Sequence, residues 1–350
     1  MALVAQTFLA LGPYGVGNLS CDSQTVAWTT SSQPRSGLNN LVRLAHFPSG
    51  SSSIVGQAEY GGTVTSPVEV AGNWVVYLEY LQYGETYTDT FWYLRAANLI
   101  TGKVLALAHA QSPTGTEPPF YSISGDLVVW NQLTVAGHEE LMAYNLGKQT
   151  VRRVPLPSGV SPIRPQVAGE NVAFLNTSVN PHAGQQDVFT RGGRPSVVDL
   201  ATGRFTQLSQ ANDAKTISLN GSVVVWSNTV PDPVNPAPAV VPDVQLTPVG
   251  GGATRVIGAV GYSIVLDSAY VVWYDTENLR LSAYALRSNR EVYIAIAGVK
   301  QSDLQSGAYA LCGDRLFFAL PPSAAGPNGP LDPRAQSFLR YVNLQGAFQS

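Results

Sequence analysis

The chain has 350 residues, of which 45% are hydrophobic and only 12% are charged, and its formal net charge at pH 7 is −3. There is no basic field to attract phosphates, so we expect no nucleic-acid partner. No apolar run approaches the ~20 residues that a bilayer-spanning helix needs, so we expect no membrane span.

The first predicted element is a strand at residues 6–11, which has no inner strand before it. Its residue pattern resembles that of the outer strand that we predict at 104–107. The last of the seven repeat units described below ends early, at 343–350. We therefore expect the N-terminal strand to join the last blade, where it would close the ring and remove an open sheet edge.

One pattern then returns seven times: an alternating apolar strand, a Gly or Ser, and five residues later an aromatic that ends a second apolar run. The repeat aromatics are Trp28, Tyr77, Trp130, Phe174, Trp226, Trp273 and Phe318. The gaps between them are 49, 53, 44, 52, 47 and 45 residues. A period of this size, filled with β-type sequence, is typical of propeller blades.

Each unit also predicts its own four strands. An inner strand alternates apolar residues with small or polar ones such as Ser122 and Ser124, which we attribute to crowding near the axis. A tight turn leads to the strand at 127–130, and further strands follow, as at 195–200 and 205–208. The chain is thus predicted to be all-β, a seven-bladed β-propeller of four-stranded antiparallel blades, and one domain over residues 1–350.

The stretch Ser-Gly-Asp-Leu-Val-Val-Trp-Asn-Gln at 124–132, with its continuation at 141–146, resembles the TolB-like and WD-like repeats of seven-bladed propellers. The resemblance spans the whole chain at the level of the repeat. The Ser-Pro-Asp-Gly turn usual in TolB-like repeats is replaced here by Ser-Gly-Asp, Ala-Gly-Glu or Asn-Gly-Ser. Such propellers serve as partner-binding modules, sugar-active enzymes and gates on peptidases, so the resemblance implies a fold and not a function.

Strand direction places both tight turns of each blade on one face and the long links on the other, where we expect binding. Two residues past the repeat aromatics, the long-link face carries Thr30, Glu79, Gln132, Asn176, Asn228, Asp275 and Leu320. Six of the seven are polar and could ring a channel mouth that holds water, a cation or sugar hydroxyls. The alternative is that strand ends meeting solvent simply require polar residues.

The second unit carries a tyrosine-rich hairpin with Tyr80, Tyr83 and Tyr87 near acidic residues. Exposed tyrosines of this kind are common at sugar-stacking and protein-docking surfaces. The alternative is that the rings of a long hairpin pack against one another.

Three histidines fall in long-loop regions: His109, His138 and His182. They are weak candidates for a base or a metal ligand, because no local spacing links them, and solvated loop histidines are the simpler interpretation. We expect no metal and no cofactor. Arg191 and Arg194, near His182, make this loop the best place for an acidic ligand.

The two cysteines leave two alternatives open. Cys21 stands in the apolar register of its inner strand, which predicts a buried thiol, whereas Cys312 is one step out of that register. Their blades become neighbours when the ring closes, so a disulfide clasp is the other alternative, against which the opposite registers argue.

The favoured hypothesis is a non-catalytic module that binds a glycan or a protein partner with its long-loop face. One alternative is a carbohydrate-active enzyme, a polysaccharide lyase or glycosidase, suggested by the histidines and by Glu79 and Asp275 on the same face. The two carboxyls could act as acid and base only at a separation of about 5–10 Å. Another alternative is a self-assembling structural subunit of an extracellular assembly. The sequence contains no serine-hydrolase elbow, phosphate loop, dinucleotide glycine pattern or zinc-protease motif.

The location is inferred from composition. Lysine occurs only at Lys103, Lys148, Lys215 and Lys300, and so sparse a charge is commoner on secreted and cell-envelope proteins. The N-terminal residues do not form a signal peptide as they stand. Either the protein is cytosolic, or the chain is the mature form of an extracellular or cell-envelope protein with an added Met1, and we favour the second alternative.

Overall fold

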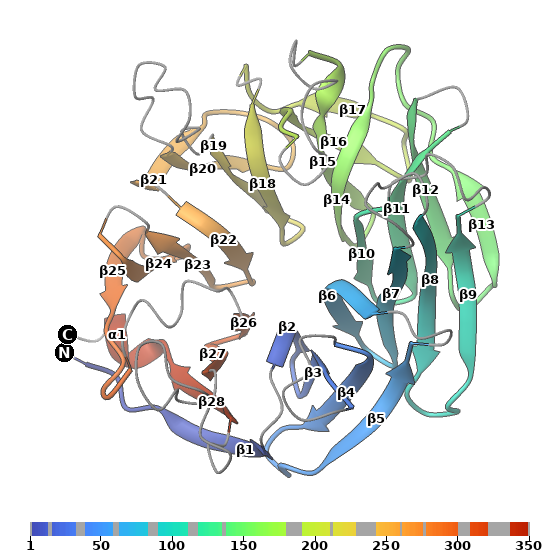
Figure 1. The fold of residues 1–350 in the computed structure, drawn as a ribbon. Helices are drawn as coiled ribbons and strands as arrows, with labels where there is room; N and C mark the ends of the chain where they lie inside the picture. Colours follow the sequence, from blue (N-terminus) through green and yellow to red (C-terminus); the bar gives the residue numbers. More distant parts are fainter. Residues whose placement is uncertain are drawn as a thin grey trace. The chain divides into compact units, whose positions relative to one another are not determined.

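The fold is seen in a computed structural model (Figure 1). It describes residues 2–12, 16–32, 39–58, 63–82, 90–110, 118–134, 138–179, 191–210, 213–228, 243–259, 261–275, 278–299, 309–320 and 337–348. The chain forms two compact units, one made of Met1–Pro118 with Ile294–Ser350 and the other of Pro119–Tyr293. That residues 1–350 act as one domain stays a prediction.

The described residues form seven sheets, each of four antiparallel strands. This is the all-β, seven-bladed β-propeller that the repeat predicts. Helical structure in the described ranges is limited to the 3₁₀ turn η2 (Thr177–Val179) and the short helix α1 (Gln345–Phe348). None of the helices that the structure describes has the length and apolar character to cross a membrane.

The first unit holds blades one, two and seven (Figure 1). Blade one consists of β2 (Val16–Asp22), β3 (Thr25–Thr30), β4 (Leu41–His46) and β5 (Ser52–Gln57). Blade two consists of β6 (Thr63–Ala71), β7 (Trp74–Gln82), β8 (Thr90–Asn98) and β9 (Val104–His109). Blade seven consists of β26 (Tyr309–Cys312), β27 (Arg315–Leu320), β28 (Ser337–Asn343) and β1 (Gln6–Gly12).

The second unit holds blades three to six. Blade three consists of β10 (Tyr121–Ser124), β11 (Leu127–Leu133), β12 (Glu139–Asn145) and β13 (Thr150–Arg153). Blade four consists of β14 (Pro162–Ala168), β15 (Asn171–Asn176), β16 (Arg194–Asp199) and β17 (Phe205–Gln207). Blade five consists of β18 (Ala214–Leu219), β19 (Val223–Asn228), β20 (Asp243–Pro248) and β21 (Arg255–Ala259). Blade six consists of β22 (Gly261–Leu266), β23 (Tyr270–Asp275), β24 (Arg280–Ala285) and β25 (Arg290–Ile294).

The N-terminal strand completes blade seven, as the sequence predicts. Figure 1 shows β1 in blue beside β28 in red, and the two pair antiparallel, with Gln6 opposite Tyr341. The Tyr341 hydroxyl donates a hydrogen bond to Gln6 Oε1. The outer edge of β28 is therefore paired with the start of the same chain and is not left as an open edge.

The repeat aromatics form the core, each at 0 or 1% exposure. Two of them lie against a glycine in the outer strand of the preceding blade. A Cβ atom built on Gly56 would lie 2.8 Å from Tyr77 Cε1, and one built on Gly258 would lie 2.2 Å from Trp273 Cζ2. Only a residue without a side chain lets the ring lie this close to the strand, so the two glycines form notches for the aromatics.

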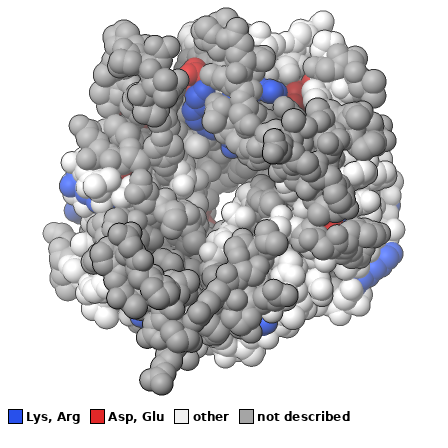
Figure 2. All heavy atoms as spheres, viewed as in Figure 1, with Lys and Arg blue, Asp and Glu red and all other residues white. Residues whose placement is uncertain are grey.

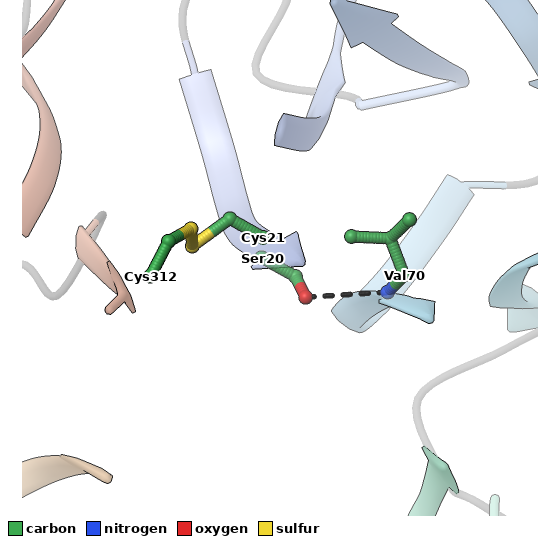
Figure 3. Close-up of a disulfide and its surroundings, with 4 residues drawn as sticks. All are labelled: Ser20, Cys21, Val70 and Cys312. Carbon is green, nitrogen blue, oxygen red and sulfur yellow. Dashed lines mark hydrogen bonds between the residues drawn. A yellow bond between two sulfur atoms is a disulfide. The ribbon is translucent and has the colours of Figure 1, made fainter. Parts of the chain in front are cut away.

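The polar residues of the inner strands bind the next blade. The donors and acceptors of the first unit are Val70 N to Ser20 Oγ (3.3 Å, Figure 3) and Gly72 N to Asp22 Oδ2 (2.6 Å). Those of the second unit include Val167 N to Ser122 Oγ (3.3 Å) and Gly169 N to Ser124 Oγ (3.1 Å). These side chains accept N–H groups from the exposed edge of an inner strand. Crowding near the axis is thus an incomplete explanation of the alternation.

Cys21 and Cys312 form a disulfide between the inner strands β2 and β26, with their Cα atoms 5.9 Å apart (Figure 3). The argument from opposite registers is therefore wrong. It compared each cysteine with the turn of its own blade, whereas strands of two different blades need not share a register. Both side chains belong to one apolar cluster, which also contains Leu19 and Phe317.

The turn between β16 and β17 is held by an aspartate. Asp199 Oδ1 accepts hydrogen bonds from the backbone N–H groups of Ala201 (2.9 Å) and Thr202 (2.8 Å). The N–H of Thr202 is the main reason that the pKa of Asp199 lies below its ordinary value of 3.8. In blade two, Asn98 Oδ1 makes the equivalent bonds to Ile100 and Thr101 without a charge.

Asp199→Asn should therefore reduce the acid sensitivity of the protein. Because the folded pKa is the lower one, the carboxylate stabilises the fold fully above the unfolded pKa. This stabilisation is lost as the pH falls through the folded pKa. We expect the melting temperature of wild type to fall more steeply than that of the variant between about pH 5 and pH 2. Asn98→Asp is the matched control, and it should gain the same acid dependence; parallel curves for all three proteins would contradict the assignment.

Candidate functional site

Blade two brings a set of chemically active side chains to its loop-side end. The strands β7, β8 and β9 pair so that Glu79 lies opposite Tyr93 and Tyr93 lies opposite His109. Directly paired residues share one face of a sheet, and Arg95, two residues past Tyr93, lies on that face as well. We call Glu79, Tyr93, Arg95 and His109 the blade-two patch.

The patch is organised around the ring of Tyr93. The His109 ring stacks on it with a centroid distance of 6.0 Å and an interplanar angle of 25°, and Arg95 Cζ lies 5.1 Å from its centroid. Arg95 Nε donates to Glu79 Oε2 at 3.0 Å, and Glu79 is only 2% exposed. His109 is exposed and Tyr93 is half-buried. The buried ion pair holds Arg95 beside the ring, while the ring and the imidazole offer an aromatic surface with polar edges.

The predicted tyrosine group is placed differently. Tyr80 pairs with Trp92, so it lies on the opposite face of β7 from Glu79, because neighbouring residues of a strand alternate. Glu79 and Tyr80 therefore do not form one site on that strand. Tyr83 and Tyr87 lie outside the described residues.

The other residues predicted at the channel mouth are engaged within their own blades. Asn176 Oδ1 accepts the N–H of Ser161 at 3.0 Å, and Asp275 Oδ1 accepts the N–H of Asn278 at 3.0 Å. Glu79, Asn176 and Asp275 are 2, 6 and 4% exposed, and Thr30 is also buried. The alternative of solvated strand ends is therefore wrong for these four buried residues, of which Asn176 and Asp275 close loops and Glu79 pairs with an arginine. The side chains of Asn228 and Leu320 lie outside the described residues.

Gln132 is half-buried, and its Oε1 accepts the indole N–H of Trp130 at 3.2 Å. It thus supports the repeat aromatic of its own blade. That Gln132, Asn176 or Asp275 also binds a ligand stays a prediction.

A second group lies on blade six. Arg280 Nε donates to Asp275 Oδ2 at 3.4 Å, and Arg280 Cζ lies 3.1 Å from the centroid of Tyr293. Loss of solvation raises the pKa of Glu291; the Ser282 hydroxyl and Arg280 oppose this rise, and the charge of Asp275 adds to it. We call Asp275, Arg280, Glu291 and Tyr293 the blade-six cluster.

The predicted arginine and histidine candidates are dispersed. Arg191 Nη1 lies 3.9 Å from Glu139 Oε1, and Asn131 Nδ2 donates to Glu139 Oε2 at 3.0 Å, so a carboxylate of the chain itself faces Arg191. Arg194 begins β16 opposite Asn176. That Arg191 and Arg194 bind an acidic ligand stays a prediction.

His138 is exposed, and its backbone N–H donates to Thr134 Oγ1 at 3.2 Å. This bond closes the hairpin loop of blade three. His182 lies outside the described residues. Within the described ranges, no three His, Cys, Asp or Glu side chains group as metal ligands would.

Figure 2 shows one face of the molecule coloured by charge. Among the described residues on this face, Lys, Arg, Asp and Glu cover a small part of the surface.

Seven four-stranded antiparallel sheets, with the N-terminal strand completing the last, define a seven-bladed β-propeller. No protein-family profile matches this chain, and no curated protein matches it. Several solved structures resemble its fold.

An oligogalacturonate lyase in complex with manganese is 11% identical, with 99% of this chain and 98% of the lyase covered and a TM-score of 0.57. A prolyl endopeptidase is 10% identical with a TM-score of 0.64, and the match covers 97% of this chain but 48% of the endopeptidase. TolB from Acinetobacter baumannii is 13% identical, with 80% and 79% covered and a TM-score of 0.46. At these identities the likeness concerns the fold alone.

Proposed function

We propose that the protein is a non-catalytic binding module that recognises a glycan or a protein partner through the blade-two patch. The observation that carries this proposal is the half-buried Tyr93 ring, flanked by the exposed His109 ring and by Arg95. An aromatic surface edged by polar donors suits the apolar face and the hydroxyls of a sugar ring, and it equally suits an interface hot spot.

The state of Glu79 favours binding over catalysis at this patch. Its carboxylate is 2% exposed and accepts a hydrogen bond from Arg95. The buried carboxylate is thus engaged by an arginine of its own blade and is poorly placed to exchange a proton with a ligand in solution. Glu79 therefore serves to position Arg95.

Tyr93→Ala is expected to weaken partner binding at least about tenfold, because truncating an aromatic hot spot costs about 2 kcal/mol or more. Binding is measured on a glycan array and by titration with each glycan that binds. Tyr293→Ala is the matched control, since Tyr293 is an exposed tyrosine that also lies beside an arginine, but on blade six. Melting temperatures verify that both variants fold.

An unchanged affinity in Tyr93→Ala would reject the blade-two patch. Loss in Tyr293→Ala alone would move the site to blade six. If no glycan binds, the same two variants are compared for capture of protein partners from the native secretome, and equal capture by both would also reject the patch.

The second candidate function is a carbohydrate-active enzyme, and the blade-six cluster favours it. This cluster groups two carboxyls with an arginine, and loss of solvation raises the pKa of Glu291, which is the direction that favours a general acid. The test is incubation of the wild-type protein with a panel of neutral and acidic polysaccharides. New reducing or unsaturated ends would support an enzyme, and their absence would leave the binding module.

The proposed location is extracellular or in the cell envelope. The disulfide between Cys21 and Cys312 supports it, because such bonds persist in oxidising compartments and are rare in the cytosol. The scarcity of charge in the sequence supports it as well.

A further inference from the structure

A cavity of ≈ 480 Å³ lies at the tight-turn edge of blades three and four, within the second unit. Its size falls in the range of small-molecule sites, about 300–1,000 Å³. Leu127 and Ala143 supply its apolar surface, while Asp126, Lys148, Arg152 and Glu170 supply charge. The proposed binding module does not use this cavity.

Pairing of the strands brings the residues of one wall together. Leu127 of β11 lies opposite Asn145 of β12, and Ala143 of β12 lies opposite Arg152 of β13. Arg152 therefore extends from the same face of the sheet as the buried Ala143. The neighbouring Arg153 lies on the other face, where its Nη1 is 3.2 Å from Glu140 Oε1.

The other wall is the turn from β14 to β15, and hydrogen bonds fix it in place. Gly169 N donates to Ser124 Oγ of blade three at 3.1 Å, and Leu200 N donates to the carbonyl oxygen of Glu170 at 2.8 Å. The cavity is thus built between two anchored walls.

The charges around the cavity balance. Lys148 and Arg152 are cations, Asp126 and Glu170 are anions, and all four side chains belong to exposed residues. Among the ion pairs between described residues, none neutralises Lys148, Arg152 or Glu170. A polyanion would be repelled by one pair of charges and a polycation by the other. A ligand with one carboxylate and one ammonium group meets both pairs favourably.

We propose that this cavity binds a small zwitterion of the amino-acid or short-peptide class. Lys148 and Arg152 bind its carboxylate, Asp126 and Glu170 bind its ammonium group, and Leu127 and Ala143 contact its apolar part. Charge-assisted hydrogen bonds to a carboxylate are about twice as strong as neutral ones, so the ionised ends of the ligand determine its recognition.

The test is calorimetric titration of the full chain with trialanine and with its N-acetylated, C-amidated form, with maltotriose as a neutral polyol. We expect millimolar or tighter binding of trialanine and at least about tenfold weaker binding of the capped form. Arg152→Gln and Glu170→Gln should each lower the affinity for trialanine about tenfold, and the double variant should lower it further. Arg153→Gln is the matched control and should bind as wild type does.

Three results of these comparisons would overturn the proposal. They are equal affinity for the free and capped peptides, equal losses in Arg152→Gln and Arg153→Gln, and preference for maltotriose over trialanine. No heat with trialanine at millimolar concentration would overturn it as well. The substituted side chains belong to exposed residues, and a melting temperature within the error of wild type confirms that each variant is folded.

Discussion

Removing the cross-link between the first and last blades, as Cys21→Ser with Cys312→Ser, should lower the melting temperature by about 8 °C. The bond joins residues 291 positions apart, and disulfides typically stabilise by about 2–4 kcal/mol, with long loops at the upper end, so we take about 4 kcal/mol. For a chain of this size, 1 kcal/mol corresponds to about 2 °C. Calorimetry with and without a reductant measures the effect.

The double serine variant is its own control. The reductant should lower the melting temperature of wild type toward that of the variant and leave the variant unchanged. Cys21→Ala with Cys312→Ala separates loss of the bond from the introduction of hydroxyls into an apolar cluster. If the reductant leaves the melting temperature of the wild-type protein unchanged, the bond contributes no stability.

Gly258→Ala should destabilise the protein by about 2–3 kcal/mol, which is the upper part of the range for overpacking a core. The added methyl group would lie 2.2 Å from a carbon of the Trp273 ring, and the ring itself is fully buried. The strand or the indole must therefore move. Denaturant unfolding followed by tryptophan fluorescence measures the change in the free energy of unfolding.

Gly250→Ala is the matched control in the same blade, because a Cβ atom there meets no atom within 4 Å. It should change the stability by less than about 0.5 kcal/mol. Trp273→Phe in the Gly258→Ala background should recover part of the loss, since the smaller ring leaves room for the methyl group. Equal stability of Gly258→Ala and Gly250→Ala would contradict the proposal that Gly258 makes room for the Trp273 ring.

The blades were predictable because their signals are local. The five-residue step from turn to aromatic and the alternation of the inner strand lie within one unit, and each repeat aromatic is buried as expected. The notches were not predicted, although an isolated glycine in an outer strand, such as Gly56, is a known sign of close approach. Its partner Tyr77 belongs to the next blade, and a single unit of sequence does not show that contact.

The candidate site was predicted less well than the fold. Glu79 and His109 were singled out as candidates. Tyr93 was noted only as one of the aromatic residues of the second unit, and Arg95 was not noted, because their proximity depends on the pairing register across a long hairpin. Strand alternation alone would have separated Tyr80 from Glu79. The disulfide depends on how neighbouring blades pack. The registers within each blade do not determine this packing, and they wrongly argued against a bond between the two cysteines.

The pairing of β1 with β28 has a consequence for synthesis on the ribosome. Tyr341, the residue that Gln6 lies opposite, is translated 335 positions after it. At about 5–20 residues per second, this strand waits on the order of tens of seconds for its partner. Strand β1 is thus among the last of the described strands to be paired, and until then its edge is open to pairing with other nascent chains.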